Sequence, residues 1–576
     1  MRLGISLLAL CFAPRAQIGG AGQPPAQTTG NVQNAPAATP AQDLCTIQGQ
    51  VFNAATGEPL KKATLNLQRT DLTPDMMSMP ATYSTTSDAS GKFGMKDLEP
   101  GKYRLTVTRN GFVSTTYGAR GLNRPGATLS LTRGQQLKDV VFRLTPHGVV
   151  AGRVVDEDGE PVPYVRVQLM TYRYLQGRKQ LTYANGASTD DLGDYRIFGV
   201  APGKYFVSAT ATNQNFPAAQ DRSATPQPDE DYVPTYYPGT TDAGNATQIE
   251  VTPGGQLRDI SLRLSKAHTI RVKGHVTYSV AGRQRVTIYL TPRNPAIGGP
   301  MSMRPTQADA KGDFDLRGVA PGSYLLTAVI NDGSKTYQAR APIDAGGSNV
   351  EGVNLTIGPG IEVSGRVRIE GADAADFGNL RLMLQPREPG GMMFGGFSPA
   401  KLDDNRAFKL ENVSPGSFNL VVTGLPSGFY LKSVRSDQTD VLANGLNTEA
   451  ASAPLDVVLR AGAAQVAGTV QNPNTSAPSP GATVVLIPQD NARKDQQTYY
   501  RQAGADQNGA FTFKDLPPGE YKLYAWEDLE AGAYMDPDFM KPVESKGEAL
   551  TLRENDQKSV QLTLIPADPP GGRDKE

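Results

Sequence analysis

Cysteine, histidine and tryptophan are scarce in this chain of 576 residues, which has 2 Cys, 3 His and 1 Trp. Cys11 lies in a segment that we expect to be removed, so disulfide bonds do not hold the fold together. Neither His147 nor His268 is followed by a Glu at the offset of a zinc peptidase. No serine-hydrolase elbow, phosphate loop or His-Glu-x-x-His motif is present either. The sequence therefore predicts no catalytic residue, no metal site and no cofactor.

An excess of one charge is also missing, because 57 Lys and Arg balance 57 Asp and Glu. A chain with zero net charge has no long-range field to attract nucleic acid or an anionic membrane. No apolar run after residue 20 approaches the roughly 18 residues that a transmembrane helix needs. We therefore predict no nucleic-acid partner and no transmembrane segment.

The N-terminal segment indicates export. Residues 3–13 form a short apolar run after Arg2, which is typical of a signal peptide. We predict a signal peptide over residues 1–19 and a secreted, periplasmic or outer-surface location. Residues 20–44 are rich in Pro, Gln and Ala with few large apolar side chains, so they predict a disordered linker. The tail 569–576 is expected to be disordered too.

A short strand with a central glycine occurs five times along the chain. The central residues are Gly49, Gly152, Gly274, Gly365 and Gly468. Each is followed after 48 to 52 residues by the glycine of a Pro-Gly turn that opens an aromatic strand. The aromatic residues are Tyr103, Tyr205, Tyr324, Phe418 and Tyr521. Such regular spacing predicts repeated domains.

Between these two landmarks, each copy has an Asp-initiated turn followed by an aromatic strand. The turns begin at Asp88, Asp190, Asp309, Asp404 and Asp506, and the fourth copy has lost the usual Gly. Asp accepts local backbone hydrogen bonds and Gly takes positive φ, as a tight hairpin requires. The flanking strands alternate strictly, as in Val165-Arg-Val167-Gln-Leu169, so one face is buried and the other is wet.

Seven or so short strands per roughly 100 residues are typical of an antiparallel β-sandwich. We therefore predict an all-β protein of five tandem, Ig-like sandwiches arranged as beads on a string. The expected boundaries are 45–146, 147–267, 268–359, 360–461 and 462–568, with a mobile insertion at 213–231. An extended array of five such domains would reach about 170 Å.

The glycine strand, the Asp hairpin and the Pro-Gly-aromatic turn together resemble the carboxypeptidase regulatory-like domains. The resemblance covers residues 45 to 566. It implies transthyretin-like sandwiches, in a superfamily that also holds carbohydrate-binding-like modules and bacterial adhesin stalks. It implies no activity, because function depends on sites rather than on the fold.

Aromatic residues offer two candidate ligand sites. The alternation of Tyr521, Leu523 and Ala525 places Trp526 and Tyr524 together on the opposite face of their strand. An exposed pair of this kind can stack on a sugar, whereas packing under the following loop is the alternative. Tyr236 and Tyr237 lie in a turn-forming segment that either packs or offers a ligand platform.

The segment before the Asp hairpin is rich in Met or Tyr in every copy, which suggests a repeated contact loop. The residues are Met76, Met77, Met79, Tyr172, Tyr174, Met301, Met303, Met392, Met393, Tyr499 and Tyr500. Flexible Met side chains suit adaptable contacts, and Met-x-Met can also bind Cu(I). A lid packed over the open end of each sandwich is the structural alternative.

The sequence thus predicts an exported, non-enzymatic binding or spacer scaffold whose partner is a protein or polysaccharide at the cell surface. One alternative is an array of carbohydrate-binding modules, with Trp526, Tyr236 and Tyr237 as sugar platforms. A second is an accessory chain of a peptidase, without catalytic activity of its own. The sequence does not define the oligomeric state.

Overall fold

The computed structural model covers most of the chain between residues 43 and 567. The described residues are 43–71, 82–175, 177–211, 230–280, 285–293, 305–332, 335–371, 375–387, 399–449, 453–494 and 496–567. The expected signal peptide, most of the linker and the expected tail lie outside them. No helix within these ranges is long and apolar enough to cross a membrane.

Five groups of strands follow one another along the chain, and we call them units 1 to 5. Unit 1 contains β1 (Cys45–Asn53), β2 (Thr64–Arg69), β3 (Thr82–Thr86), β4 (Lys92–Leu98), β5 (Gly101–Thr108), β6 (Thr115–Thr116), β7 (Leu129–Leu131) and β8 (Gln136–Leu144). Unit 2 contains β9 (Gly148–Val155), β10 (Arg166–Leu175), β11 (Arg178–Ser188), β12 (Asp194–Val200), β13 (Gly203–Thr210), β14 (Glu230–Tyr232), β15 (Thr235–Tyr236), β16 (Ile249–Val251), β17 (Gln256–Leu257), β18 (Leu262–Arg263) and β19 (Lys266–His268).

The remaining units are built in the same way. Unit 3 contains β20 (Ile270–Tyr278), β21 (Val286–Pro292), β22 (Thr306–Gln307), β23 (Asp313–Val319), β24 (Gly322–Asn331), β25 (Thr336–Ala345) and β26 (Val350–Ile357). Unit 4 contains β27 (Ile361–Glu370), β28 (Arg381–Pro386), β29 (Ala407–Val413), β30 (Ser417–Thr423), β31 (Phe429–Ser436), β32 (Thr439–Asp440), α1 (Val441–Asn444), β33 (Leu446–Asn447) and β34 (Leu455–Ala461). Unit 5 contains β35 (Ala464–Gln471), β36 (Thr483–Pro488), α2 (Asn491–Lys494), β37 (Arg501–Gly504), β38 (Ala510–Leu516), β39 (Gly519–Trp526), α3 (Pro537–Met540), β40 (Glu548–Leu552) and β41 (Gln557–Ile565).

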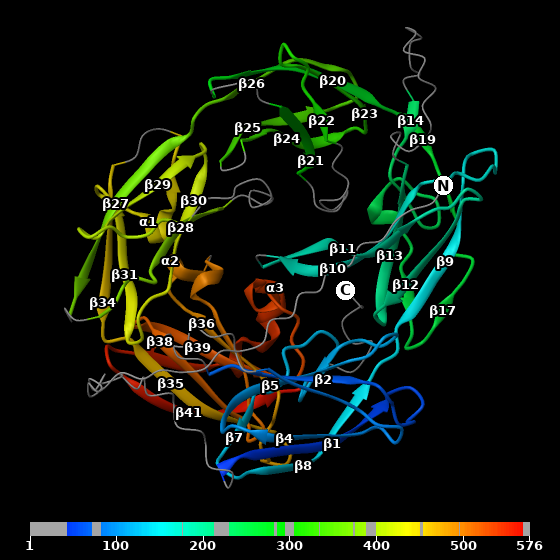
Figure 1. The fold of residues 1–576 in the computed structure, drawn as a ribbon. Coiled ribbons are helices and arrows are strands. Elements are labelled where there is room, and N and C mark those ends of the chain that lie inside the picture. The colour runs from blue at the N-terminus through cyan, green and yellow to red at the C-terminus, as the bar shows by residue number, and fades with distance from the viewer. Residues whose placement is uncertain are drawn as a thin grey trace, which may run out of the picture.

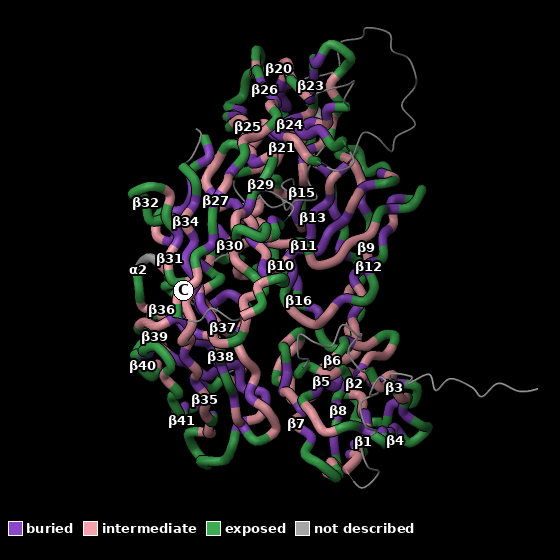
Figure 2. Tube along the Cα trace, turned by 60° about the vertical axis from the view of Figure 1, so that its left-hand side comes forward, coloured by how far each residue is buried: buried purple, intermediate pink, exposed green. Residues whose placement is uncertain are grey.

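All five units share one strand pairing. The opening strand pairs antiparallel with the strand after the Asp hairpin and parallel with a closing strand. A second group of strands, such as β2 and β5 in unit 1, forms the facing layer. Each unit has its own cluster of buried apolar residues, and Figure 2 shows these residues concentrated along the strands. The all-β sandwich prediction is confirmed, while the domain boundaries stay a prediction.

The central glycine of each opening strand is explained by close approach. Gly49 pairs with Phe93 on one side and Val140 on the other. A Cβ on Gly49 would overlap the Val140 carbonyl oxygen and lie 2.8 Å from the Phe93 ring. The other four units repeat this arrangement, with the glycine opposite Tyr195, Phe314, Phe408 or Phe511. The motif therefore marks the place where three strands meet without room for a side chain.

The Asp hairpins form as expected, except in unit 4. The Asp88 carboxylate accepts hydrogen bonds from the backbone N–H groups of Ser90 at 2.8 Å and Lys92 at 2.9 Å. In unit 4 the residue that does this is Asp403, not Asp404, because it bonds the N–H groups of Asn405 and Ala407. Arg406 takes the place of the missing glycine at φ 58°, a conformation that costs a residue with a side chain about 1 kcal/mol.

The units do not lie in an extended row, which differs from the beads-on-a-string expectation. Figure 1 shows them following one another around a ring, so that unit 1 lies beside unit 5. The hairpin of β10 and β11 points into the ring and ends near α3 of unit 5. Glu230 and Asp231, which we expected in a mobile insertion, lie in β14 and pair with β19. Residues 213–229 of that insertion are outside the described residues.

Candidate functional site in the junctions between units

Trp526 and Tyr524 lie on one face of β39, as the alternation predicts. Their rings stack with centroids 5.2 Å apart and an interplanar angle of 20°. However, Trp526 is only 2% exposed and Tyr524 only 3%. Residues of the following segment, including Leu529 and Tyr534, cover them in a second apolar cluster of unit 5. The pair is therefore covered by the following segment, as in the packing alternative, and leaves no open ring face for a sugar.

Tyr236 and Tyr237 are also packed rather than displayed. Tyr236 is 2% exposed and lies against Met170 and Leu181, while Tyr237 is half-buried against the core of unit 2. Burial raises the pKa of Tyr236 to about 12, so its hydroxyl stays protonated at neutral pH. The packing alternative describes these two residues better than an open platform.

The predicted contact loop of unit 2 contacts another part of the same chain. Tyr172 is exposed at the surface of β10, with the Lys179 ammonium 5.2 Å from its ring centroid. Tyr174 instead packs into the second apolar cluster of unit 5, with its ring centroid 6.1 Å from that of Phe539. The loop thus forms an internal junction between units 2 and 5.

In unit 5 the segment just before the equivalent residues Tyr499 and Tyr500 contacts unit 4. The Gln496 side chain donates a hydrogen bond to the backbone oxygen of Leu442 in α1. Tyr500 packs on Tyr534 with centroids 5.6 Å apart, and burial raises the pKa of Tyr499 to about 12. The seven Met residues of the predicted contact loops lie outside the described residues. Their role stays a prediction.

Two arginines of unit 1 close the ring, and we call the contact between units 1 and 5 the ring seam. The Arg120 guanidinium lies 2.8 Å from a Glu527 carboxylate oxygen and donates to the Pro480 backbone oxygen at 3.0 Å. Arg124 forms a second ion pair with Asp528. Because these side chains are a quarter to a third exposed, each pair contributes about 1 kcal/mol or less.

A side-chain amide of unit 5 and close backbone contacts also join the two units at the ring seam. The Ser130 N–H donates to Gln507 Oε1 at 3.0 Å, and the Gln507 amide donates back to the Ser130 oxygen at 2.7 Å. A Cβ on Gly481 would overlap the Gly118 oxygen, and one on Gly504 would lie 2.5 Å from the Gly126 oxygen. Glycines on both sides therefore permit direct backbone packing.

Glu530 lies where units 1, 2 and 5 meet. Burial raises the pKa of its carboxyl group, while the positive charges of Arg124, Arg173 and Lys179 act in the opposite direction. Arg124 belongs to unit 1, whereas Arg173 and Lys179 belong to the β10–β11 hairpin of unit 2. The pKa of Glu530 in unit 5 therefore depends on charged residues of two other units.

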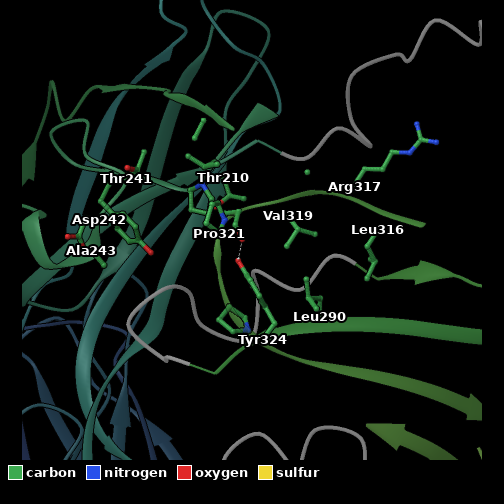
Figure 3. Close-up of a pocket in the computed structure, with 17 residues that line it drawn as sticks. Thr210, Thr241, Asp242, Ala243, Leu290, Leu316, Arg317, Val319, Pro321 and Tyr324 are labelled. Atoms are coloured by element: carbon green, nitrogen blue, oxygen red, sulfur yellow. Dashed lines mark hydrogen bonds between the residues drawn. The ribbon is translucent and has the colours of Figure 1, made fainter. Parts of the chain in front are cut away.

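A cavity of about 450 Å³ lies between units 2 and 3. Unit 3 contributes Leu290, Leu316, Val319 and Tyr324, and Figure 3 shows the Tyr324 hydroxyl turned toward the Pro321 turn. That hydroxyl donates to the Ala320 backbone oxygen at 2.8 Å. Unit 2 contributes Thr210, Val233, Pro234, Tyr236, Thr241, Asp242, Ala243 and Ala267. Most of the lining is apolar, which is typical of a small-molecule pocket.

Metal ligands do not gather anywhere in the described part of the chain, where no three His, Cys, Asp or Glu side chains lie close enough to hold an ion. Cys45 is a free, buried cysteine of unit 1. The features described so far define a multi-unit β-sandwich protein whose characteristic contacts are those between its units.

The family follows from a comparison with known domains. Residues 46–145, 149–235 and 465–564 match the carboxypeptidase regulatory-like domain. The chain therefore carries carboxypeptidase regulatory-like domains in tandem, and the tandem-repeat prediction is confirmed. Units 3 and 4 lie outside these matches but have the same strand pairing around the central glycine.

The solved structures that match this chain include bacterial proteins of low sequence identity. The minor pilin GBS52 of Streptococcus agalactiae is 15% identical, with a TM-score of 0.22, over 39% of this chain and 96% of that one. The Bacillus anthracis TIE protein is 10% identical, with a TM-score of 0.15, over 91% of this chain and 75% of that one. The comparison with curated proteins found no match.

Proposed function

We propose that this protein is an exported, non-enzymatic scaffold that presents a closed ring of β-sandwiches to partners outside the cytoplasm. The ring seam is the observation that carries this proposal. Because Arg120 and Arg124 pair with Glu527 and Asp528, tandem sandwiches become one platform instead of a long spacer. The match to regulatory-like domains supports a non-catalytic role.

A protein partner fits the surface better than a polysaccharide. Apart from Val141 of unit 1, the exposed large apolar side chains among the described residues belong to unit 2, where Phe198 is 69% exposed, Leu192 58% and Tyr164 49%. Exposed apolar groups of this kind favour contact with another protein. The one tryptophan, by contrast, is buried. We therefore propose protein recognition, with a polysaccharide as the alternative outcome of a binding screen.

Export can be tested with the N-terminal segment alone. Residues 1–44 fused to alkaline phosphatase, a reporter that needs disulfides, are expected to give active enzyme because the segment directs the reporter to an oxidising compartment. Leu8→Arg should abolish this activity by interrupting the apolar run, whereas Gln17→Arg outside the run should leave it intact. Inactive reporter in the parent fusion would contradict export.

The closed ring can be tested by small-angle X-ray scattering. A compact arrangement of about 520 residues has a radius of gyration near 25 Å, whereas a straight array about 170 Å long gives about 50 Å. We expect the native protein near the lower value. Gly504→Val combined with Arg124→Glu should raise the radius by several ångströms, because it adds atoms against Gly126 and reverses a charge facing Asp528.

The matched control keeps both types of substitution away from the ring seam. Gln502→Val lies two residues before Gly504 on β37, and Arg133→Glu reverses an exposed charge of unit 1. This control should scatter like the native protein. A native radius of gyration near 50 Å, or an equal increase in both double variants, would contradict the closed ring and favour an extended spacer.

A further inference from the structure

The cavity between units 2 and 3 has the size and the lining of a ligand site. Its volume of about 450 Å³ falls in the range of roughly 300 to 1,000 Å³ that small-molecule pockets occupy. Apolar walls come from both units, with Pro234 and Val233 on one side and Leu290, Leu316 and Val319 on the other. Two separately packed cores therefore leave an apolar space where they meet.

The charged residues at the cavity are already paired. The Asp242 carboxylate accepts hydrogen bonds from the Gly244 N–H at 2.9 Å and the Asn245 amide at 3.2 Å. The Arg317 guanidinium lies 3.0 Å from Asp315, and Figure 3 shows the Arg317 side chain directed away from the other labelled residues. A charged ligand would thus lose its hydration without gaining an ion pair in return.

The wall contains few uncharged polar side chains, which are Tyr236 and the threonines Thr210 and Thr241 beside the committed Tyr324. Tyr236 lines the cavity and is 2% exposed as a whole residue, and its hydroxyl makes no hydrogen bond seen among the described residues. The Tyr324 hydroxyl, by contrast, is committed to Ala320. The Tyr236 hydroxyl can therefore donate to, or accept from, one polar atom of a bound molecule.

We propose that this cavity binds a small, uncharged, largely apolar molecule that carries one polar atom for the Tyr236 hydroxyl. A sugar fits poorly, because most of its hydroxyl groups would lie against the apolar part of the walls without partners. Such a site goes beyond the proposed scaffold role and does not rest on it. It would make the junction of units 2 and 3 responsive to a diffusible compound.

The first experiment titrates the full-length protein with N-phenyl-1-naphthylamine, a neutral dye whose fluorescence rises in apolar surroundings. We expect one saturable site per chain. Ala267→Trp, which fills the cavity from β19, should weaken dye binding at least tenfold. His268→Trp places the same side chain on the exposed neighbour and should leave binding within twofold of native.

A second filling variant guards against misfolding. Ala243→Trp enters the cavity from the short 3-10 helix Ala243–Asn245, which is at the surface and contains no buried residue. Thermal melts of each variant establish that it is folded. Unchanged dye affinity in both filling variants would show that the dye binds outside the cavity. The absence of saturable binding to the native protein would contradict the proposed site.

The role of the Tyr236 hydroxyl is tested with two competitors that differ by one group. In native protein 2-naphthol should displace the dye about fivefold better than naphthalene, because one neutral hydrogen bond is gained. In Tyr236→Phe the two competitors should perform equally. Equal displacement from native protein, or a preference that survives Tyr236→Phe, would contradict the assigned hydrogen bond.

Discussion

Gly49→Ala is expected to destabilise unit 1 by about 3 kcal/mol, at the upper end of the cost of overpacking. The added methyl group would overlap the Val140 oxygen and press on the Phe93 ring. Neither neighbour can withdraw easily, because Val140 is held in the parallel pairing with β1 and Phe93 in the antiparallel one. Hydrogen exchange followed by mass spectrometry should show faster exchange in β1 and β8, with unit 5 as internal reference.

Gly94→Ala is the matched control, since Gly94 lies on β4 next to Phe93 and pairs with Gln48. A Cβ there would meet no atom within 4 Å. We expect a change within about 0.5 kcal/mol, as for an open surface position. Equal exchange rates in the two variants would show that close approach does not explain the repeated glycine.

Trp526→Ala should cost about 3 to 5 kcal/mol in unit 5, the usual range for removing a large buried aromatic side chain. The indole packs in the cluster of Leu529, Tyr534 and Tyr174, so its loss should also loosen the junction with unit 2. Differential scanning calorimetry of the full chain is the measurement. A cost below about 0.5 kcal/mol would mean that Trp526 is exposed in solution.

Trp526→Phe separates the contribution of the ring's apolar contacts from the cost of its buried indole N–H group. The Trp526 indole nitrogen is buried and has no hydrogen-bond partner among the described residues. A phenyl ring keeps much of the apolar contact and removes this unsatisfied donor, so the two effects partly cancel. We expect a loss of about 1 kcal/mol or less. A loss as large as that of Trp526→Ala would point to a partner for the indole nitrogen.

The repeat pattern predicted the fold well because each signal has a local cause. The spacing between Gly49 and the Pro-Gly turn reports a fixed strand arrangement, and alternation correctly placed Trp526 with Tyr524 on one face of β39. The fourth hairpin was misplaced by one residue, at Asp404 instead of Asp403. The glycine that marks the register is missing there, because Arg406 itself adopts the left-handed conformation. The five-residue distance from Asp to the aromatic residue, as from Asp88 to Phe93, selects Asp403.

The contacts between units could not be predicted from the sequence in the same way. Alternation shows that Trp526 faces away from its sandwich core, but not that Leu529 and Tyr534 then cover it. The hydrogen bond from Arg120 to Pro480 joins residues 360 positions apart, and no periodicity relates them. Such pairs depend on the shape of whole units, so ring closure and the cavity between units 2 and 3 became visible only in three dimensions.

The parallel pairing of opening and closing strands has a consequence for mechanical load. A pull on the two ends of unit 1 acts along β1 and β8 in opposite directions, so their seven residue pairs resist together in shear. Unit 5 has seven such pairs between β35 and β41. In unit 2 the closing strand is split, with two pairs to β17 and two to β18. Under tension unit 2 should therefore yield first, releasing length while its neighbours stay folded.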